Sequence, residues 1–136
     1  MITSPINYNA RGDVWISIID SKSNHLVFED HNLILENAKK IFVNAIGGNA
    51  FVVDTIQVKK SGGLLAEATV MVDFPAGDDK VRFTARFDEA SFNDTLDEIR
   101  LVSSAGGDFA EITGLSIAKD SLNQLEIVWQ VTLNNL

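Results

Sequence analysis

The chain has 136 residues, of which 46% are hydrophobic and 22% charged, a composition typical of one globular domain rather than a disordered segment. Eleven Lys and Arg against nineteen Asp and Glu give a net charge of −8, which argues against nucleic-acid binding because that function needs a basic face. The absence of cysteine excludes disulfides and thiolate chemistry, and no apolar run reaches transmembrane length. We therefore expect that the protein has no membrane partner and is synthesised in the cytoplasm.

The first twelve residues, MITSPINYNARG, combine Pro5 and Gly12 with scattered apolar side chains. This composition indicates an extended N-terminal arm over residues 1–12, of a kind that in an oligomer often lies on a neighbouring subunit. Residues 13–136 contain no internal repeat and no linker, so we expect them to fold as a single domain.

Most of the chain has the residue content of β-strands, rich in β-branched and aromatic side chains and separated by polar or glycine-containing turns. The expected strands are eight segments: 13–20, 25–29, 51–60, 64–74, 80–88, 95–103, 109–118 and 125–133. Segment 95–103 shifts its alternation near Leu96, which suggests a bulge, and segment 109–118 is broken by Gly114.

The clearest alternation is in segments 64–74 and 80–88, which we expect to pair as a hairpin with one buried face and one wet face. Val72 and Phe74 are on the expected buried face. Glu67 is on the expected wet face, where it would meet basic side chains of the partner strand.

One stretch, HNLILENAKKIFVNAIGG at residues 31–48, has helical periodicity. Asn32 has the properties of an N-cap, and Gly47 suits the left-handed position that follows a helix. The sequence therefore predicts one α-helix over about residues 33–46. The apolar side chains of its stripe recur at spacings of three and four: Ile34, Leu35, Ala38, Ile41, Phe42, Ala45 and Ile46.

The expected strands are short and most of them are not followed by a helix, which argues against parallel βαβ units. The predicted fold class is mainly β. We expect an antiparallel β-sandwich of about eight strands, with the single α-helix packed on it or closing one end.

Motifs that carry chemistry are sparse. His25 and His31 are six residues apart with no cysteine nearby, which is not a zinc-ligand spacing. Glycine pairs occur at element ends without the pattern of a phosphate-binding loop, and no nucleophile elbow is present. We therefore predict no catalytic, metal or cofactor-binding residues, no cofactor and no enzymatic activity.

The carboxylates between residues 88 and 98 leave one enzymatic alternative. Asp88, Glu89, Asp94 and Asp97 lack the spacing of a calcium-binding EF-hand. A glycosidase needs two carboxylates facing each other across a cleft, which a sequence alone does not reveal. Acidic loops are more often simply solvated. An enzyme that uses these four residues is therefore a weaker hypothesis than the two described below.

Aromatic side chains offer a second alternative, a platform on which a sugar could stack. Trp129 is on the wholly apolar face of its strand, so core packing is expected there. Trp15 is out of phase with Val14 and Ile16, so either Trp15 or those neighbours face solvent. Tyr8 lies in the expected arm.

The order of these parts resembles small structural proteins of tailed bacteriophages and the related N-terminal domains of tail-fibre and collar proteins. The resemblance spans about residues 13–133 and departs at Arg100, where the pattern more often has Gly. Four stretches carry it: E-D-H-N-L-I (29–34) before a helix, L-D-E-I-R-L-V-S-S-A-G-G-D-F-A (96–110), then Lys119, and the closing L-E-I-V-W-Q-V-T-L (125–133).

The resemblance implies a non-enzymatic virion component of the tail, collar, fibre attachment or head surface, made in the host bacterial cytoplasm. It also implies a homo-oligomer that docks to other virion structural proteins, without nucleic acid or membrane. The working surfaces would be the arm 1–12, the wet sheet faces, and loops such as 75–79 and 104–108. The main alternative is a carbohydrate- or receptor-binding module on the same scaffold, with an exposed Trp15 or Tyr8.

Overall fold

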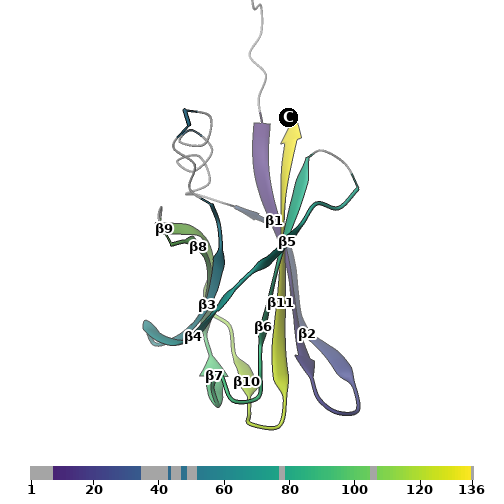
Figure 1. The fold of residues 1–136 in the computed structure, drawn as a ribbon, viewed down its shortest axis with the longest axis vertical. Helices are drawn as coiled ribbons and strands as arrows, with labels where there is room; N and C mark the ends of the chain where they lie inside the picture. The colour runs from purple at the N-terminus through teal and green to yellow at the C-terminus, as the bar shows by residue number, and fades with distance from the viewer. Residues whose placement is uncertain are drawn as a thin grey trace, which may run out of the picture.

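The structure, a computed structural model, describes residues 8–34, 43, 47–48, 52–76, 79–104 and 107–135. The described part is dominated by β-strands (Figure 1). The strands are β1 (Tyr8–Ile19), β2 (Asn24–Ile34), β3 (Thr55–Lys60), β4 (Gly63–Thr69), β5 (Met71–Asp73), β6 (Lys80–Phe87), β7 (Asp94–Leu96), β8 (Glu98–Ser103), β9 (Gly107–Ile112), β10 (Ile117–Lys119) and β11 (Gln124–Asn135).

The strands form three sheets, and every strand pair in them is antiparallel. The largest sheet has five strands in the order β2-β1-β11-β6-β5, and a second has four in the order β4-β3-β8-β9. Strands β10 and β7 pair separately. The prediction of a mainly β, antiparallel fold is confirmed.

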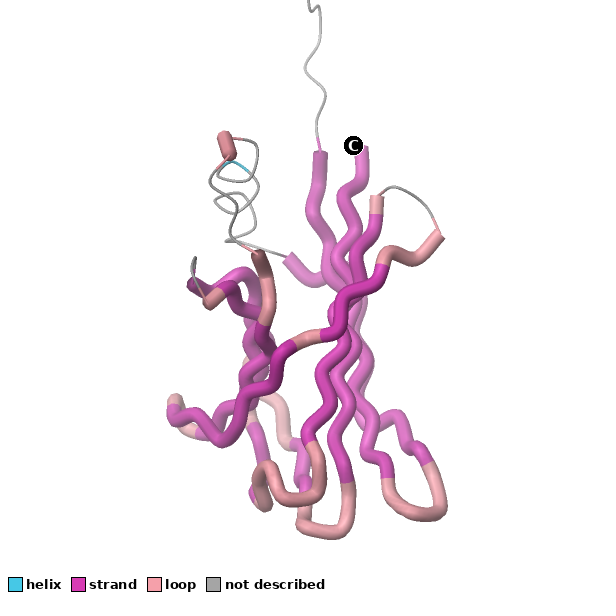
Figure 2. The backbone as a smooth tube through the Cα atoms, viewed as in Figure 1, coloured by secondary structure: helices cyan, strands magenta, loops and turns pink. Residues whose placement is uncertain are grey.

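The two larger sheets contribute to a single hydrophobic core, and Figure 2 shows them as two groups of strands. Alternation along each strand explains which side chains enter the core, since successive residues point to opposite faces. Burying one such Leu, Ile or Phe stabilises the fold by about 1.5–3 kcal/mol. The five-stranded sheet supplies Val14, Ile16, Phe83, Ala85, Phe87, Leu125, Ile127, Trp129 and Val131, and the four-stranded sheet supplies Ile56, Val58, Ile99, Leu101, Phe109, Ala110 and Ile112.

The expected strand 64–74 is in fact two strands in two different sheets. It divides at Val70, whose N–H donates to the carbonyl of Asp54 at 2.9 Å. Because β4 joins the four-stranded sheet, Glu67 lies opposite Gln57 rather than a basic residue of β6. The expectation that Phe74 faces the core is also wrong, because its side chain is 76% exposed.

Two other expected strands divide in the same way. Segment 95–103 separates into β7 and β8 at Asp97, whose N–H donates to the carbonyl of Lys59. Segment 109–118 separates into β9 and β10 around Gly114, which has a φ of +73°. The described residues therefore form eleven strands where about eight were expected.

The predicted helix over residues 33–46 is wrong at its start. Residues 33 and 34 extend β2, where they pair with Gly12 and Arg11 of β1. Pairing across the sheet thus overrides the local helical period. Val43 has helical geometry and its carbonyl accepts from the N–H of Gly47 at 3.2 Å, but residues 35–42 and 44–46 lie outside the described part of the chain.

The end of the expected N-terminal arm also belongs to the sheet. Residues 8–12 are the beginning of β1 and pair with the end of β11, from Tyr8 opposite Asn135 to Gly12 opposite Val131. Residues 1–7 of the expected arm lie outside the described residues. The first and last described strand ends are consequently next to each other at one end of the molecule (Figure 1).

Candidate functional site

The four carboxylates of the enzymatic alternative each have a separate structural role. Asp88 accepts from the backbone N–H of Ala90 at 3.0 Å within its own turn. Glu89 accepts from the side-chain amide of Gln124 at 3.0 Å. Each of these two carboxylates is thus engaged in a hydrogen bond of its own.

Asp94 and Asp97 hold the turn that follows β3. Asp94 accepts from Lys60 Nζ at 2.7 Å, and Asp97 accepts from the backbone N–H of Ser61 at 2.9 Å. The hydrogen bond from Lys60 is the main reason that the pKa of Asp94 lies below its usual value. A lowered pKa does not suit a general acid, and these contacts give Asp94 and Asp97 a structural role at the turn.

Lys119, which the sequence singled out only as part of a resemblance, is a buried cation. Its Nζ donates to the backbone carbonyls of Glu89, Phe92 and Asp120 at 3.1, 2.9 and 3.0 Å. Burial lowers its pKa, while the nearby carboxylates of Asp88, Glu89 and Asp120 act in the opposite direction. Since all three ammonium hydrogens have acceptors, Lys119 is a clamp between the loop 88–92 and β10.

Arg100, the position that departs from the phage-protein pattern, lies on the four-stranded sheet among three carboxylates. It forms ion pairs with Glu98, Asp108 and Glu111, the last two at 2.6 and 3.5 Å. The hydrogen bond to Glu98 is the main reason that the pKa of Arg100 is raised. A glycine there would leave these acidic groups without their shared cation.

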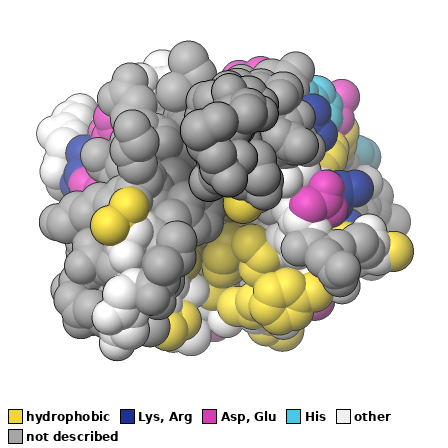
Figure 3. Space-filling model, turned by 90° about the horizontal axis from the view of Figure 1, so that it is seen from above, with side chains coloured by type: hydrophobic (Ala, Val, Ile, Leu, Met, Phe, Trp, Pro, Cys, Tyr) yellow, Lys and Arg dark blue, Asp and Glu magenta, His cyan; other side chains and the backbone are white. Residues whose placement is uncertain are grey.

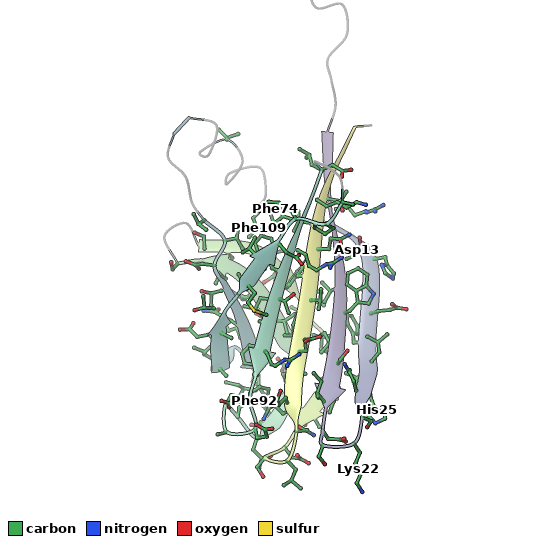
Figure 4. All side chains as sticks on the ribbon, turned by 45° about the vertical axis from the view of Figure 1, so that its right-hand side comes forward. Asp13, Lys22, His25, Phe74, Phe92 and Phe109 are labelled. Atoms are coloured by element: carbon green, nitrogen blue, oxygen red, sulfur yellow. The ribbon has the colours of Figure 1, made fainter. Side chains whose placement is uncertain are left out.

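The two histidines of β2 are not joined in a metal site. His25 Nε2 lies 2.6 Å from Ser23 Oγ, near the β1–β2 turn. His31 Nδ1 lies 3.1 Å from Asp13 Oδ1, and Figure 4 shows Asp13 well away from His25 along the sheet. Within the described ranges, no group of three or more His, Cys, Asp or Glu side chains is placed to hold a metal ion.

The two tryptophans lie on opposite faces of the five-stranded sheet. Trp129 is fully buried in the core, as expected from its strand. Val14 and Ile16 are also fully buried, so the alternation of β1 places Trp15 on the outer face, where it is half-buried. The side chain of Tyr8 lies outside the described part of the structure.

Trp15 borders a depression of about 420 Å³ on this outer face. The register explains how the site forms: Trp15 of β1 lies opposite Val128 of β11, which lies opposite Thr84 of β6. Asp73 and Arg82 are register partners on β5 and β6 and border the same space. We call this site the Trp15 depression, and its lining residues are Trp15, Asp73, Arg82, Thr84, Glu126 and Val128.

The charged side chains around the Trp15 depression are balanced. Arg82 Nη1 lies 3.9 Å from Asp73 Oδ2, and its Nη2 donates to Gln130 Oε1 at 3.3 Å. Glu126 is paired with Arg86 at 2.6 Å on the neighbouring row. The site therefore presents hydrogen-bonding groups of both kinds without a dominant charge.

The Trp15 ring is supported from the side of β2. The rings of Trp15 and His31 meet edge to face, with centroids 5.6 Å apart and planes at 71°. His31 is in turn held by the buried side chain of Asp13, which also lies 3.7 Å from Arg11 Nε. These contacts restrict the indole on the side away from the depression.

A second notable surface is the edge strand β5, whose apolar side chains face solvent. Met71 is 69% exposed and Val72 is 47% exposed, and Phe74, directly after the strand, is exposed as well. Figure 4 shows Phe74 in the upper half of the molecule and Phe92 in the lower half, and Figure 3 shows hydrophobic side chains gathered on the molecule as it is seen from above. We call these three residues the β5 apolar edge.

No model of a protein family matches the chain, and no curated protein matches it. Among the described residues, no helix is long and apolar enough to cross a membrane.

Proposed function

We propose that the protein is a non-enzymatic structural component of a tailed-bacteriophage virion. It acts in the tail, collar, fibre attachment or head surface after synthesis in the bacterial cytoplasm. The two larger sheets serve as the layers of a β-sandwich scaffold, and the protein forms a homo-oligomer that docks to other virion proteins. The order of sequence elements described above supports this assignment.

The observation that carries the proposal is the β5 apolar edge. The edge of the five-stranded sheet exposes three apolar side chains to solvent, Met71, Val72 and Phe74. Covering them would contribute several kcal/mol, at about 1.5–3 kcal/mol each. Among the described strands β5 pairs only with β6, so its other side offers backbone groups to a further strand. A second copy of the chain is the partner that this edge best suits.

The net charge of −8 is consistent with this role and gives nucleic acid no general attraction. The acidic loop 88–98 is occupied by structural contacts, so the proposal requires no catalytic residue and no cofactor. The protein recognises its virion partners by the shape of its surface and by apolar contacts.

Sedimentation velocity of the purified chain over a range of concentrations tests the proposal. We expect an oligomer that Phe74→Ser or Met71→Ser dissociates, and that Leu122→Ser leaves intact. Leu122 is the matched control because it is 80% exposed but lies in the turn between β10 and β11, at the other end of the molecule (Figure 1). A monomer at every concentration, or an oligomer that none of these variants changes, would refute assembly through β5.

A further inference from the structure

We propose that the Trp15 depression is a binding site for a neutral oligosaccharide of hexopyranose units. The assignment goes beyond a role in assembly and is carried by different observations. It rests on an aromatic side chain, a rim of hydrogen-bonding groups and a balance of charge, all within one depression of the five-stranded sheet.

The aromatic part of the site is Trp15. One face of a hexopyranose ring presents C–H groups, which pack on an aromatic ring while the hydroxyl groups remain at the edge. Trp15 is half-buried and borders the depression, and its contact with His31 holds it from the opposite side. A ring that is already held loses little conformational entropy when a ligand binds.

The polar part of the site comes from three strands. Arg82 supplies N–H donors, Asp73 and Glu126 supply carboxylate acceptors, and the Thr84 hydroxyl can act as either. Arg82 reaches Asp73 only at 3.9 Å and Gln130 at 3.3 Å, so its five N–H groups are not consumed by strong contacts. Vicinal hydroxyl groups of a sugar match such a mixture of donors and acceptors.

The balance of charge selects among sugars. The two carboxylates of the rim each have an arginine beside them, Arg82 for Asp73 and Arg86 for Glu126. A phosphate or a carboxylated sugar would meet these carboxylates without an excess of positive charge to compensate. The site therefore favours a neutral ligand over an anionic one.

The size of the depression agrees with a small ligand. Its volume of about 420 Å³ is at the lower end of the range of roughly 300–1,000 Å³ that small-molecule sites occupy. Its lining has two apolar side chains, Trp15 and Val128, and four polar ones, so it is more polar than a typical small-molecule site and suits a ligand rich in hydroxyl groups.

The test is an array of immobilised neutral and anionic oligosaccharides, probed with the full chain and followed by calorimetric titration of the strongest ligands. We expect binding to neutral hexopyranose oligosaccharides. Trp15→Ala should weaken it at least tenfold, and Thr84→Val, which removes one hydroxyl, should weaken it severalfold. Leu122→Ser, which changes an exposed apolar side chain outside the depression and outside the β5 apolar edge, should leave it unchanged.

Circular dichroism of each variant separates lost binding from lost folding, and Arg82→Gln provides a second site variant at a partly exposed position. No binding to any neutral oligosaccharide, binding to anionic sugars alone, or binding that Trp15→Ala and Arg82→Gln leave intact would overturn the proposal. The readout is ligand binding rather than sedimentation, so a failure of this proposal and a failure of the assembly proposal are separate results.

Discussion

The clamp formed by Lys119 allows a quantitative prediction for Lys119→Met, which keeps most of the side-chain length but removes the ammonium. A hydrogen bond from a charged donor contributes about 1.5–3 kcal/mol when its acceptor stays buried. Of the three carbonyls involved, that of Phe92 forms the fully buried bond, whereas those of Glu89 and Asp120 are in partly buried contacts that water can replace.

The cation also lies 5.1 Å from the centroid of the Phe92 ring, a contact that adds about 0.5–2 kcal/mol. Against these gains stands the cost of burying the ammonium, the same effect that lowers its pKa. We therefore expect Lys119→Met to lower the free energy of unfolding by about 2–4 kcal/mol.

Urea unfolding followed by circular dichroism measures this change, with equal m values showing that the unfolded states are comparable. Lys60→Met is the matched control, because Lys60 forms an exposed ion pair with Asp94, and such pairs contribute little. If Lys119→Met were no more destabilising than Lys60→Met, the clamp would not be holding the loop 88–92.

Two further predictions concern single residues. Burial raises the pKa of Asp54, but hydrogen bonds from Ser104 and Thr55 outweigh this and leave the pKa below its usual value of about 4. The stabilisation by Asp54 is thus complete above about pH 4 and is lost as the pH falls through the lowered pKa. The difference in unfolding free energy between wild type and Asp54→Ala should therefore shrink in acid. A difference independent of pH would contradict this. Gly114→Ala should lower the free energy of unfolding by about 1–2 kcal/mol because Gly114 has a φ of +73°. Gly63→Ala is the control and should be nearly neutral, because a Cβ there meets its nearest atom at an ordinary 3.5 Å. Thermal unfolding of both variants measures the difference, and equal effects would refute the backbone argument.

The sequence predicted the strand content well because alternation is a local signal. Trp129 and Phe83 are buried as their patterns require, and the irregularities near Leu96 and Gly114 mark real breaks. What local pattern does not encode is the sheet that each strand joins. Alternation continues unchanged through Val70, and only the bond from its N–H to Asp54 places the two halves in different sheets.

The site was only partly predictable for a related reason. Alternation predicts that Trp15 and Val14 lie on opposite faces of the sheet but does not say which of them faces solvent. The structure buries Val14, so Trp15 lies on the outer face. Its neighbours Asp73 and Arg82 reach the same depression only because β5 and β6 pair in that sheet, which depends on long-range contacts. Lys119 entered only through the resemblance, and its structural role gave no sequence signal because its partners are backbone carbonyls, two of them in a distant loop.

The antiparallel pairing of β1 with β11 has a mechanical consequence. Tyr8 and Asn135 are register partners at the same end of the ladder. A pulling force applied between them would open the hydrogen bonds between the two strands one pair after another, as a zipper opens, and would meet little resistance. A force applied between Tyr8 and the β10–β11 turn at the other end would instead load many of these bonds together in shear, so the resistance of this domain to extension depends on where it is held.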